Sequence, residues 1–331
     1  MYSLTGSPSQ ADELTLDDLD QVTVNKMYLP DVVAMRLGLM CTLYVQRPHD
    51  LAVRRALARC GDQYQSMFGE HLTLYLNPTG NGSFVRYRSS GVSLAKYLET
   101  NKTPDRPFAP RFTSGTHYKN ASSHSLNIWA GDAQWVPAED VAGYFAATLP
   151  FAFLNDQPEQ GAFQHLVHEW CKILKPYCGY AGIGAIQSVD STEQLRTVGQ
   201  VYPIAQRFLG VEIENASIVS VHIESHIKSV NWLTALSDEA LAPIGGRRAL
   251  LAQLDENFRI MEYDGGVLIQ AGPMPQLGNA NRREIPRYYR RLAQLVRPIR
   301  MQFPEGHSFI RPGAGRSGAE ATNEWLARFD D

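Results

Sequence analysis

Apolar runs and regular apolar-polar patterns divide most of the chain into strands and helices. Residues 35–45 (MRLGLMCTLYV) form an almost continuous apolar run, which is typical of a buried strand. Residues 48–68 begin with Pro and Asp and place apolar residues near one face, and this pattern predicts a helix. Alternation over 71–77 predicts a second strand, which a Pro- and Gly-containing turn at 78–82 ends.

A similar order of elements recurs later in the chain. A strand is predicted over 143–155, a helix over 158–174 and another strand over 178–188. Both blocks have the order β-α-β and about the same length, which is compatible with two related halves covering 29–132 and 140–331. Residue identity between the blocks is too low to establish a duplication.

The C-terminal part of the chain predicts both helices and antiparallel strands. A helix is expected over 192–209, a strand over 219–234, and a further helix from Pro286, a residue that favours the first helical position. Asp264 and Gly265 supply the positive-φ turn of a hairpin between two arms rich in β-formers. Because helices and strands intermingle and one hairpin is antiparallel, the predicted class is α+β with a mixed or antiparallel sheet.

Composition and charge exclude several classes of protein. The chain has 331 residues, of which 44% are hydrophobic and 20% are charged, as in ordinary globular proteins. Its 31 basic and 34 acidic residues give a net charge of −3, so no overall field attracts nucleic acid or an anionic membrane. The sequence shows no secretory signal and no apolar run of the roughly 18 residues that a membrane span needs. We therefore expect a cytoplasmic protein that does not bind a membrane.

The first residues differ from the rest in composition. Residues 1–28 are rich in Ser, Asp and Thr, which predicts a loosely ordered, acidic N-terminal segment. Residues 29–331 are expected to form a single α+β domain. The acids that precede the first basic residue, Lys26, are Asp12, Glu13, Asp17, Asp18 and Asp20.

One stretch contains residues that bind metals in other proteins. If 219–234 is a strand, His222 and Glu224 point to the same face about 6.6 Å apart and can share a metal ion. His226 lies about 13 Å from His222 on such a strand, which is too far for the same ion. The sequence shows no third ligand, so a solvated or partner-facing strand is the favoured interpretation. A metal-dependent hydrolase that uses His222 and Glu224 is the alternative.

Other catalytic signals are incomplete. His168 begins a motif like the HExxH of zinc proteases, but Lys172 stands where the second histidine belongs. Gly182 and Gly184 suggest a dinucleotide fingerprint, but Gln187 stands where it requires glycine. The four cysteines form no CxxC pair. These observations predict a protein without a cofactor or a catalytic centre.

A basic segment near the C-terminus has two interpretations. Residues 282–300 contain seven arginines beside two tyrosines, a composition found in nucleic-acid-binding segments. Apolar residues also recur there at helical spacing, which predicts an amphipathic helix whose arginines face solvent and pair with acids. The second interpretation is favoured, so no direct contact with nucleic acid is expected. The apolar stripe consists of Ile285, Tyr289, Leu292 and Val296.

The C-terminal third resembles a known family. Residues 231–246 (NWLTALSDEALAPIGG) and 265–300 are similar to a family of bacterial type VI secretion immunity proteins. Members often carry aspartate where Asn279 stands, so a role of charge in that turn does not transfer to this chain. The matching residues are Asn231-Trp232-Leu233-Thr234, Gly245-Gly246, Ala271-Gly272-Pro273, Pro275, Leu277-Gly278, Asn281-Arg282, Tyr289 and Pro298-Ile299-Arg300.

The resemblance implies a function and a partner. Such proteins neutralise antibacterial toxins, and several toxins matched to this family resemble nucleases of the restriction-endonuclease type. An inhibitor of this kind acts by covering the active or substrate-binding surface of the toxin and is not an enzyme. Because a DNA-binding groove is basic, carboxylates are favoured opposite it. The expected partner-binding residues are Asp17, Asp18, Asp20, Glu224, Asp238 and Glu239, whereas the family-motif residues, Trp232 among them, are expected to hold the fold.

Overall fold

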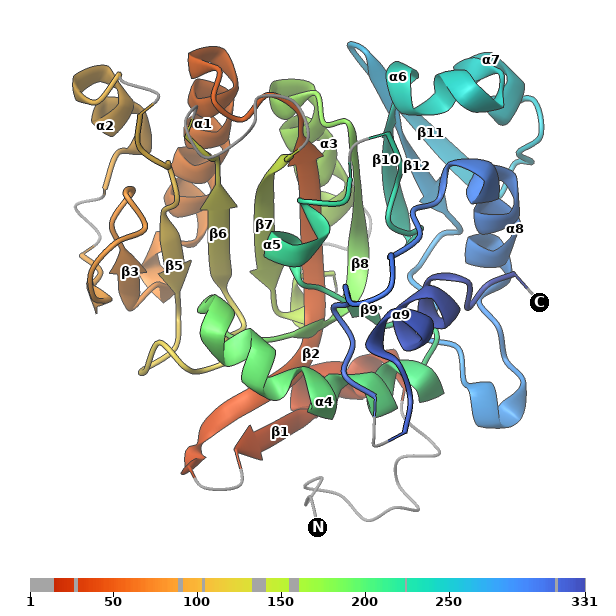
Figure 1. Ribbon diagram of the computed structural model, residues 1–331, viewed down its shortest axis with the longest axis horizontal. Coiled ribbons are helices and arrows are strands. Elements are labelled where there is room, and N and C mark those ends of the chain that lie inside the picture. Colours follow the sequence, from red (N-terminus) through yellow and green to blue (C-terminus); the bar gives the residue numbers. More distant parts are fainter. Residues whose placement is uncertain are drawn as a thin grey trace.

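The structure is built on one large sheet. The computed structural model describes residues 15–26, 29–88, 92–102, 105–132, 141–154, 161–223, 225–312 and 315–330. Its 12-stranded sheet has the order β11-β12-β10-β8-β2-β7-β6-β5-β3-β4, with β1 paired to β2 and β9 paired to β8 (Figure 1). The strands are β1 (Thr23–Lys26), β2 (Leu29–Val45), β3 (Leu74–Leu76), β4 (Val85–Arg86), β5 (Arg111–Thr113), β6 (Ser125–Trp129), β7 (Gly143–Leu149), β8 (Cys178–Ile186), β9 (Glu212–Ile213), β10 (Leu233–Ser237), β11 (Phe258–Tyr263) and β12 (Gly266–Ala271).

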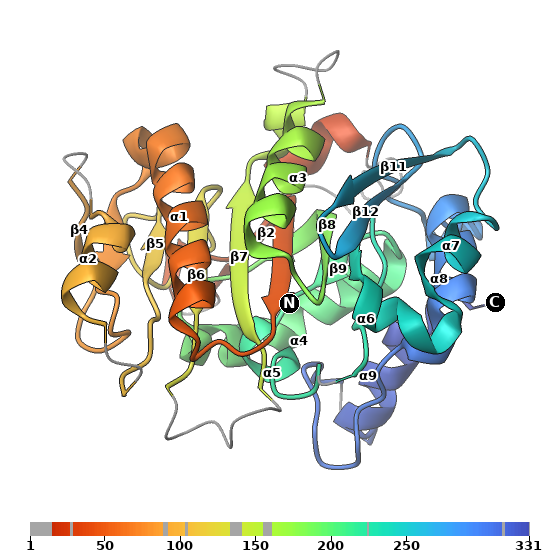
Figure 2. The same cartoon turned by 90° about the horizontal axis from the view of Figure 1, so that it is seen from above.

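Helices lie on both faces of this sheet. The α-helices are α1 (Leu51–Phe68), α2 (Leu94–Thr100), α3 (Ala162–Leu174), α4 (Ser191–Arg207), α5 (Ala216–Val219), α6 (Asp238–Leu241), α7 (Gly246–Leu251), α8 (Arg287–Val296) and α9 (Gly318–Leu326). Short 3-10 helices are η2 (Leu16–Gln21), η3 (Gly69–His71), η4 (Phe151–Leu154), η6 (Ala242–Ile244), η7 (Ala280–Arg282) and η8 (Arg297–Ile299). The two views together place α1 and α3 on one side of the central strands and α4 and α5 on the other (Figures 1 and 2).

The predicted class is confirmed. The strand pairs of the sheet are antiparallel except for β8 and β9, which run parallel, so the chain is α+β with a mixed, mainly antiparallel sheet. The two related halves and the domain boundary at residue 28 stay predictions. Residues 16–21 and 23–26, inside the predicted lead-in, form η2 and β1.

The central strand β2 explains how the two faces differ. Side chains alternate along a strand, so Cys41 points to one face and Thr42 to the other. Burial raises the pKa of Cys41, and Cys60 of α1 and Cys171 of α3 lie close enough to add to this effect. Cys41 therefore faces α1 and α3 in an apolar core. Thr42 lies on the opposite face, beside residues of α4 and α5.

Several predicted elements are confirmed in place. The helix predicted over 48–68 is α1, and the strand predicted over 178–188 is β8. The hairpin of β11 and β12 turns at Asp264 and Gly265, and the φ of Gly265 is 82°, in the region that favours glycine. No helix among the described residues combines the length and apolar character needed to cross a bilayer.

The strand predicted over 219–234 is wrong. The short helix α5 ends at Val219, and His222 N–H then donates to Val219 O at 2.9 Å in a local turn. Backbone groups used in such turns cannot join a sheet ladder, and β10 begins only at Leu233. Lys228, expected on a polar outward face, is buried with 1% of its surface exposed.

Candidate functional site

The strand register aligns five residues on the face of the sheet opposite α1 and α3. Arg111 of β5 pairs with Asn127 of β6, and Asn127 pairs with Ala146 of β7. Ala146 also pairs with Thr42 of β2, and Thr42 pairs with Tyr180 of β8. Side chains of directly paired residues lie on the same face, with Cβ atoms about 4.5–5.5 Å apart. We call Arg111, Asn127, Ala146, Thr42 and Tyr180 the polar row.

Aromatic side chains lie along one side of the polar row. Trp129 of β6 pairs with Tyr144 of β7, and Tyr144 pairs with Tyr44 of β2. Each lies two residues along its strand from a member of the polar row and therefore on the same face. The rings of Trp129 and Tyr144 stack with centroids 6.2 Å apart and an interplanar angle of 19°. Burial raises the pKa of Tyr144, whereas the nearby Arg111 and Asn127 act in the opposite direction. The aromatic residues and the polar row therefore form one continuous surface.

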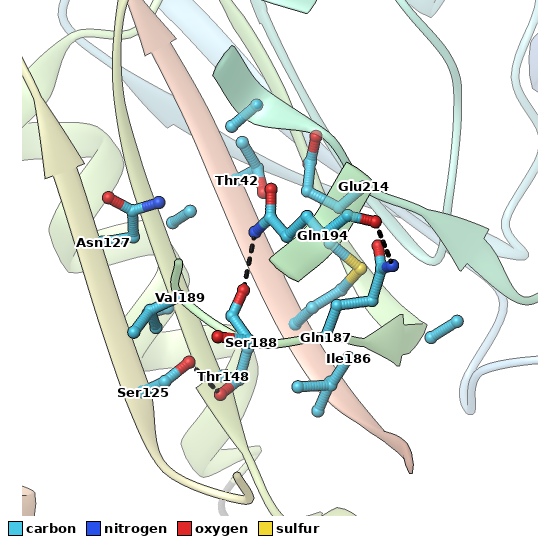
Figure 3. Close-up of a pocket in the computed structure, with 15 residues that line it drawn as sticks. Thr42, Ser125, Asn127, Thr148, Ile186, Gln187, Ser188, Val189, Gln194 and Glu214 are labelled. Atoms are coloured by element: carbon cyan, nitrogen blue, oxygen red, sulfur yellow. Dashed lines mark hydrogen bonds between the residues drawn. The ribbon is translucent and has the colours of Figure 1, made fainter. Parts of the chain in front are cut away.

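A small cavity opens over the polar row. Its volume is about 50 Å³, and Thr42, Asn127 and Ala146 line it together with Gln194 of α4 and Glu214 (Figure 3). Thr42 is fully buried and Asn127 is 9% exposed. Within the described part of the chain, Thr42 Oγ1 and Asn127 Oδ1 have no protein hydrogen-bond partner. Such buried acceptors are costly to leave unpaired, so this cavity is chemically distinct from the core around it.

Buried charges support the far end of the polar row. Tyr180 donates to Glu214, and Tyr44 donates to the same carboxylate at 3.1 Å. Lys228 Nζ donates to Tyr180 Oη at 2.9 Å and lies 3.7 Å from Glu214. Burial raises the pKa values of both tyrosines well above normal, and Glu214 adds to the effect. Both hydroxyls therefore stay protonated and act as donors to the carboxylate.

The cluster continues to the C-terminal segment. Glu212 is fully buried. Lys228 Nζ lies 3.0 Å from its Oε1, and Arg328 donates to its Oε2 at 3.0 Å. The Lys228 contact is an ion pair whose angle is unsuited to a hydrogen bond, since Glu212 Oε1 has no hydrogen-bond partner in the described residues. Arg328 also lies over the Trp325 ring, 3.6 Å from its centroid. These contacts join α9 to the sheet.

The family described as "TsiV: Type VI immunity for VRR-NUC" has a model that matches residues 56–329. The chain belongs to this family. A solved structure of a Pseudomonas aeruginosa T6SS protein is similar, with a TM-score of 0.80 and 26% sequence identity over 92% of this chain and 85% of that chain. A search of curated proteins gave no match. The resemblance predicted from the C-terminal motifs is therefore confirmed, and the family is one of immunity proteins rather than enzymes.

Two of the acids expected to bind a partner have local structural roles in this immunity protein. Asp18 accepts from Thr15 N at 3.1 Å and from Thr15 Oγ1 at 2.6 Å, which caps η2. Asp20 accepts from the backbone N–H groups of Phe151 and Ala152, both at 2.7 Å, and so caps η4. Asp17, which precedes Asp18 in η2, is exposed.

Replacing Asp20 with alanine should lower the free energy of unfolding by about 1–2 kcal/mol, because the backbone donors of Phe151 and Ala152 lose a charged cap. Urea denaturation of the two proteins measures this difference. Asp17→Ala is the matched control and should leave stability within about 0.5 kcal/mol. Loss of nuclease binding by Asp20→Ala with no loss of stability would instead place Asp20 in the interface.

Asp238 and Glu239 begin α6 and are exposed. Arg247 binds Asp238 through two hydrogen bonds, of 2.8 and 2.6 Å. Glu239 accepts from Gln46 Nε2 at 3.2 Å. Asp238 N–H also donates to Gly265 O at 2.9 Å, so α6 adjoins the turn of the β11-β12 hairpin. Asp238 and Glu239 therefore share one exposed corner, on a different element from Asp17, Asp18 and Asp20.

The proposed metal ligands do not lie on a strand. Glu224 falls outside the described residues, and His222 lies in the loop after α5. His222 Nε2 is 3.0 Å from Nδ1 of His307, and its ring packs edge-on against Phe303 at 4.8 Å between centroids. The described residues contain no group of three or more His, Cys, Asp or Glu able to hold a metal ion.

Sequence reasoning missed the polar row. The alternation in SLNIW (125–129) indicates which residues of β6 share a face, because Ser125, Asn127 and Trp129 are two positions apart. The strands that carry Thr42 and Arg111 lie far from β6 in sequence, however. No local pattern specifies which strands become neighbours or in which register.

Proposed function

We propose that this immunity protein protects its cell by binding a VRR-NUC effector nuclease and covering its active or DNA-binding surface. The family match over residues 56–329 carries this proposal. Inhibition by coverage requires shape and charge complementarity and no reaction centre. We also propose that the protein acts in the cytoplasm, because a nuclease that attacks DNA must be neutralised where the DNA is.

The required affinity sets the scale of the interface. One escaped nuclease molecule can damage the genome, so binding should be nanomolar or tighter. Interfaces of this kind bury about 1,200–2,000 Å² in total and depend on a few aromatic or arginine anchors within a polar rim. The affinity should come mainly from the anchors, and the association rate from the rim charges.

The exposed acids suit the rim of such an interface. Asp238 and Asp264 retain 52% and 82% side-chain exposure although each has a basic partner. A groove that binds DNA phosphates is basic, so carboxylates at this corner would attract it over a distance of about 10 Å at moderate salt. Asp17, Glu224 and Glu239 are proposed as further rim residues. Asp18 and Asp20 are weaker candidates, because each already caps a 3-10 helix.

Co-expression tests the proposed function directly. Cells that make the cognate VRR-NUC effector should die, and cells that also make this protein should survive. The purified pair should form a complex with a Kd in the nanomolar range or below, measured with a catalytically inactive nuclease. Cell death in the presence of soluble, folded protein would refute the immunity role.

A further inference from the structure

We propose that a groove between residues 273–278 and the start of α8 is a docking site for an acidic segment of the nuclease. One apolar side chain of that segment would lie in the groove, and its carboxylates would pair with the arginines beside it. This inference rests on the proposed function and adds a second place of contact, with the opposite charge from the acidic rim.

Five arginines around the start of α8 have no acidic partner. Residues 282–296 contain these five arginines and one glutamate, a net charge of +4. The two arginines that follow, Arg297 and Arg300, both pair with Asp330, whereas the five form no ion pair with any described residue. The pairing with acids that the sequence predicts is therefore confined to the end of the segment. We call the five residues the arginine surface: Arg282, Arg283, Arg287, Arg290 and Arg291.

Most of the arginine surface is available to a partner. Four of its residues are exposed, and the fifth, Arg290, is half-buried. Hydrogen bonds from Asn257 are the main cause that lowers the pKa of the nearby Asp255. Arg291 and Arg287 lower it further but form no ion pair with it. Guanidinium groups without a fixed carboxylate can each bind one from a partner through two parallel hydrogen bonds.

The groove adjoins this charge. Its volume is about 490 Å³, which lies within the size range of protein ligand sites. Pro273, Met274 and Ile285 give it apolar walls, and Met274 keeps 42% of its surface exposed. Arg287 lines the groove and also belongs to the arginine surface, so an apolar side chain and a carboxylate of one segment can be bound side by side. Methionine and arginine are both enriched at protein interfaces.

Hydrogen bonds hold the groove in one shape. Gln276 N–H donates to Tyr289 Oη at 2.9 Å. Asn279 and Glu284 exchange two backbone hydrogen bonds, of 2.8 and 2.9 Å. Gly278, before Asn279, has a φ of 67°, in the region that favours glycine. The groove is therefore formed before a partner arrives, which reduces the entropy lost on binding.

The two tyrosines beside the arginines do not suit nucleic acid. Bases bind by stacking on exposed aromatic rings. The Tyr288 ring already contacts Arg287, whose guanidinium carbon is 4.6 Å from the ring centroid, and a Cβ on Gly272 would lie 2.4 Å from a ring carbon. Tyr289 is fully buried. Glu284, which lines the groove, would also repel phosphates. An acidic protein segment is therefore the favoured ligand.

One interface can include both the acidic corner and the groove. Asp238 binds the turn that precedes Gly266 of β12, and Tyr288 packs against Gly272, just after the other end of β12. The five steps from Gly266 to Ala271 span about 17 Å. An interface of standard size covers about 800 Å² on each partner and is roughly 30 Å across. The nuclease can therefore place a basic surface against the acids and an acidic segment against the arginine surface.

Arg287→Glu combined with Arg291→Glu tests the charge of the docking site. Both side chains are exposed, so the melting temperature should stay within about 2 °C of that of the unaltered protein. Affinity for the catalytically inactive cognate nuclease should fall about 100-fold at 50 mM salt, because two attractive contacts become repulsive. The loss should shrink to about 10-fold or less at 500 mM salt. Titration calorimetry of the complex measures both values.

A matched pair of substitutions on α1 controls for net charge. Arg55→Glu combined with Arg59→Glu changes the net charge by the same amount at the same helical spacing, and both arginines are exposed. In Figure 1, α1 lies toward the other end of the sheet from α8. This control should therefore keep the affinity within about 2-fold, since only the weak overall field of the protein changes.

Met274→Ala tests the apolar part of the groove. Affinity for the nuclease should fall about 10-fold at both 50 and 500 mM salt, because burial of apolar surface is not screened by ions. Met67→Ala in α1 is the control, because Met67 is 45% exposed, and it should leave affinity unchanged. Both free proteins should keep the melting temperature of the unaltered protein, since neither side chain belongs to the core.

Three results would overturn the inference. The first is equal affinity of the α8 double variant and its α1 control. The second is unchanged affinity of Met274→Ala. The third is binding of duplex DNA by the unaltered protein at 50 mM salt that Arg287→Glu with Arg291→Glu abolishes, which would assign the arginine surface to nucleic acid. Failure of the unaltered protein to bind the nuclease would refute the proposed function, and the inference with it.

Discussion

Replacing Glu212 with alanine should lower the free energy of unfolding by about 3–5 kcal/mol, because buried Arg328 loses its carboxylate partner and buried Lys228 keeps only Glu214, 3.7 Å away. Lys228 Nζ and Arg328 Nη2 each lie 3.0 Å from Glu212, and the exposed fractions of their side chains are 0% and 3%. Neither cation can reach water without opening the core. Burial already lowers the pKa of Arg328, and Glu212 is the main group that opposes this effect. Urea denaturation at neutral pH measures the loss.

Two further variants separate charge from shape in this test. Glu212→Gln keeps the size of the side chain but not its charge, so it should lose a similar amount if the ion pairs matter most. Glu320→Ala removes an exposed carboxylate of α9 and should change stability by less than about 0.5 kcal/mol. A loss below 1 kcal/mol for Glu212→Ala would show that the cations find other partners and that the cluster does not stabilise α9.

The cluster of buried charges also reaches the cavity above the polar row. Lys228 connects Glu212 to Tyr180, the last residue of the polar row, through a 2.9 Å hydrogen bond. Tyr180 in turn donates to Glu214 at the wall of the cavity. Glu212→Ala should therefore also loosen the wall of this cavity.

The sequence predicted elements whose pattern is local. The apolar run at 35–45 became part of β2, and the positive φ of Gly265 follows from a two-residue turn. The predicted apolar stripe of 285–296 is confirmed, since Tyr289, Leu292 and Val296 are buried in α8 together with Ala293, and Ile285 packs partly buried against the core. In each of these segments the predictive pattern comes from residues close together in the sequence, and their propensity and spacing decide the local structure.

The sequence could not predict features that depend on distant contacts. Lys228 appears in an alternating segment, so a strand with outward polar residues was expected. Its charge is instead balanced by Glu212 and Glu214, and the segment winds inward to reach them. Arg328, a hundred residues further on, completes the cluster. The polar row depends in the same way on the order of five strands, which no pattern within one strand specifies.

Trp232 tests the expectation that the family-motif residues hold the fold. Trp232 is fully buried between α3 and the β12 end of the sheet. Its ring stacks on Phe163 with an interplanar angle of 6°, and Nε1 donates to Gly272 O at 3.0 Å. Trp232→Ala should lower the free energy of unfolding by about 3–5 kcal/mol, because the cavity it leaves is lined by well-packed side chains. Chemical denaturation measures this loss.

Trp232→Phe is the control that separates packing from hydrogen bonding. It keeps a ring against Phe163, and Gly272 O still accepts from Gln270 Nε2 at 3.0 Å, so no carbonyl is left unpaired. The loss should therefore be about 1–2 kcal/mol, mostly from the smaller ring. Nuclease affinity of the folded Trp232→Phe protein should equal that of the unaltered protein. Weaker binding at unchanged stability would contradict a purely structural role of Trp232.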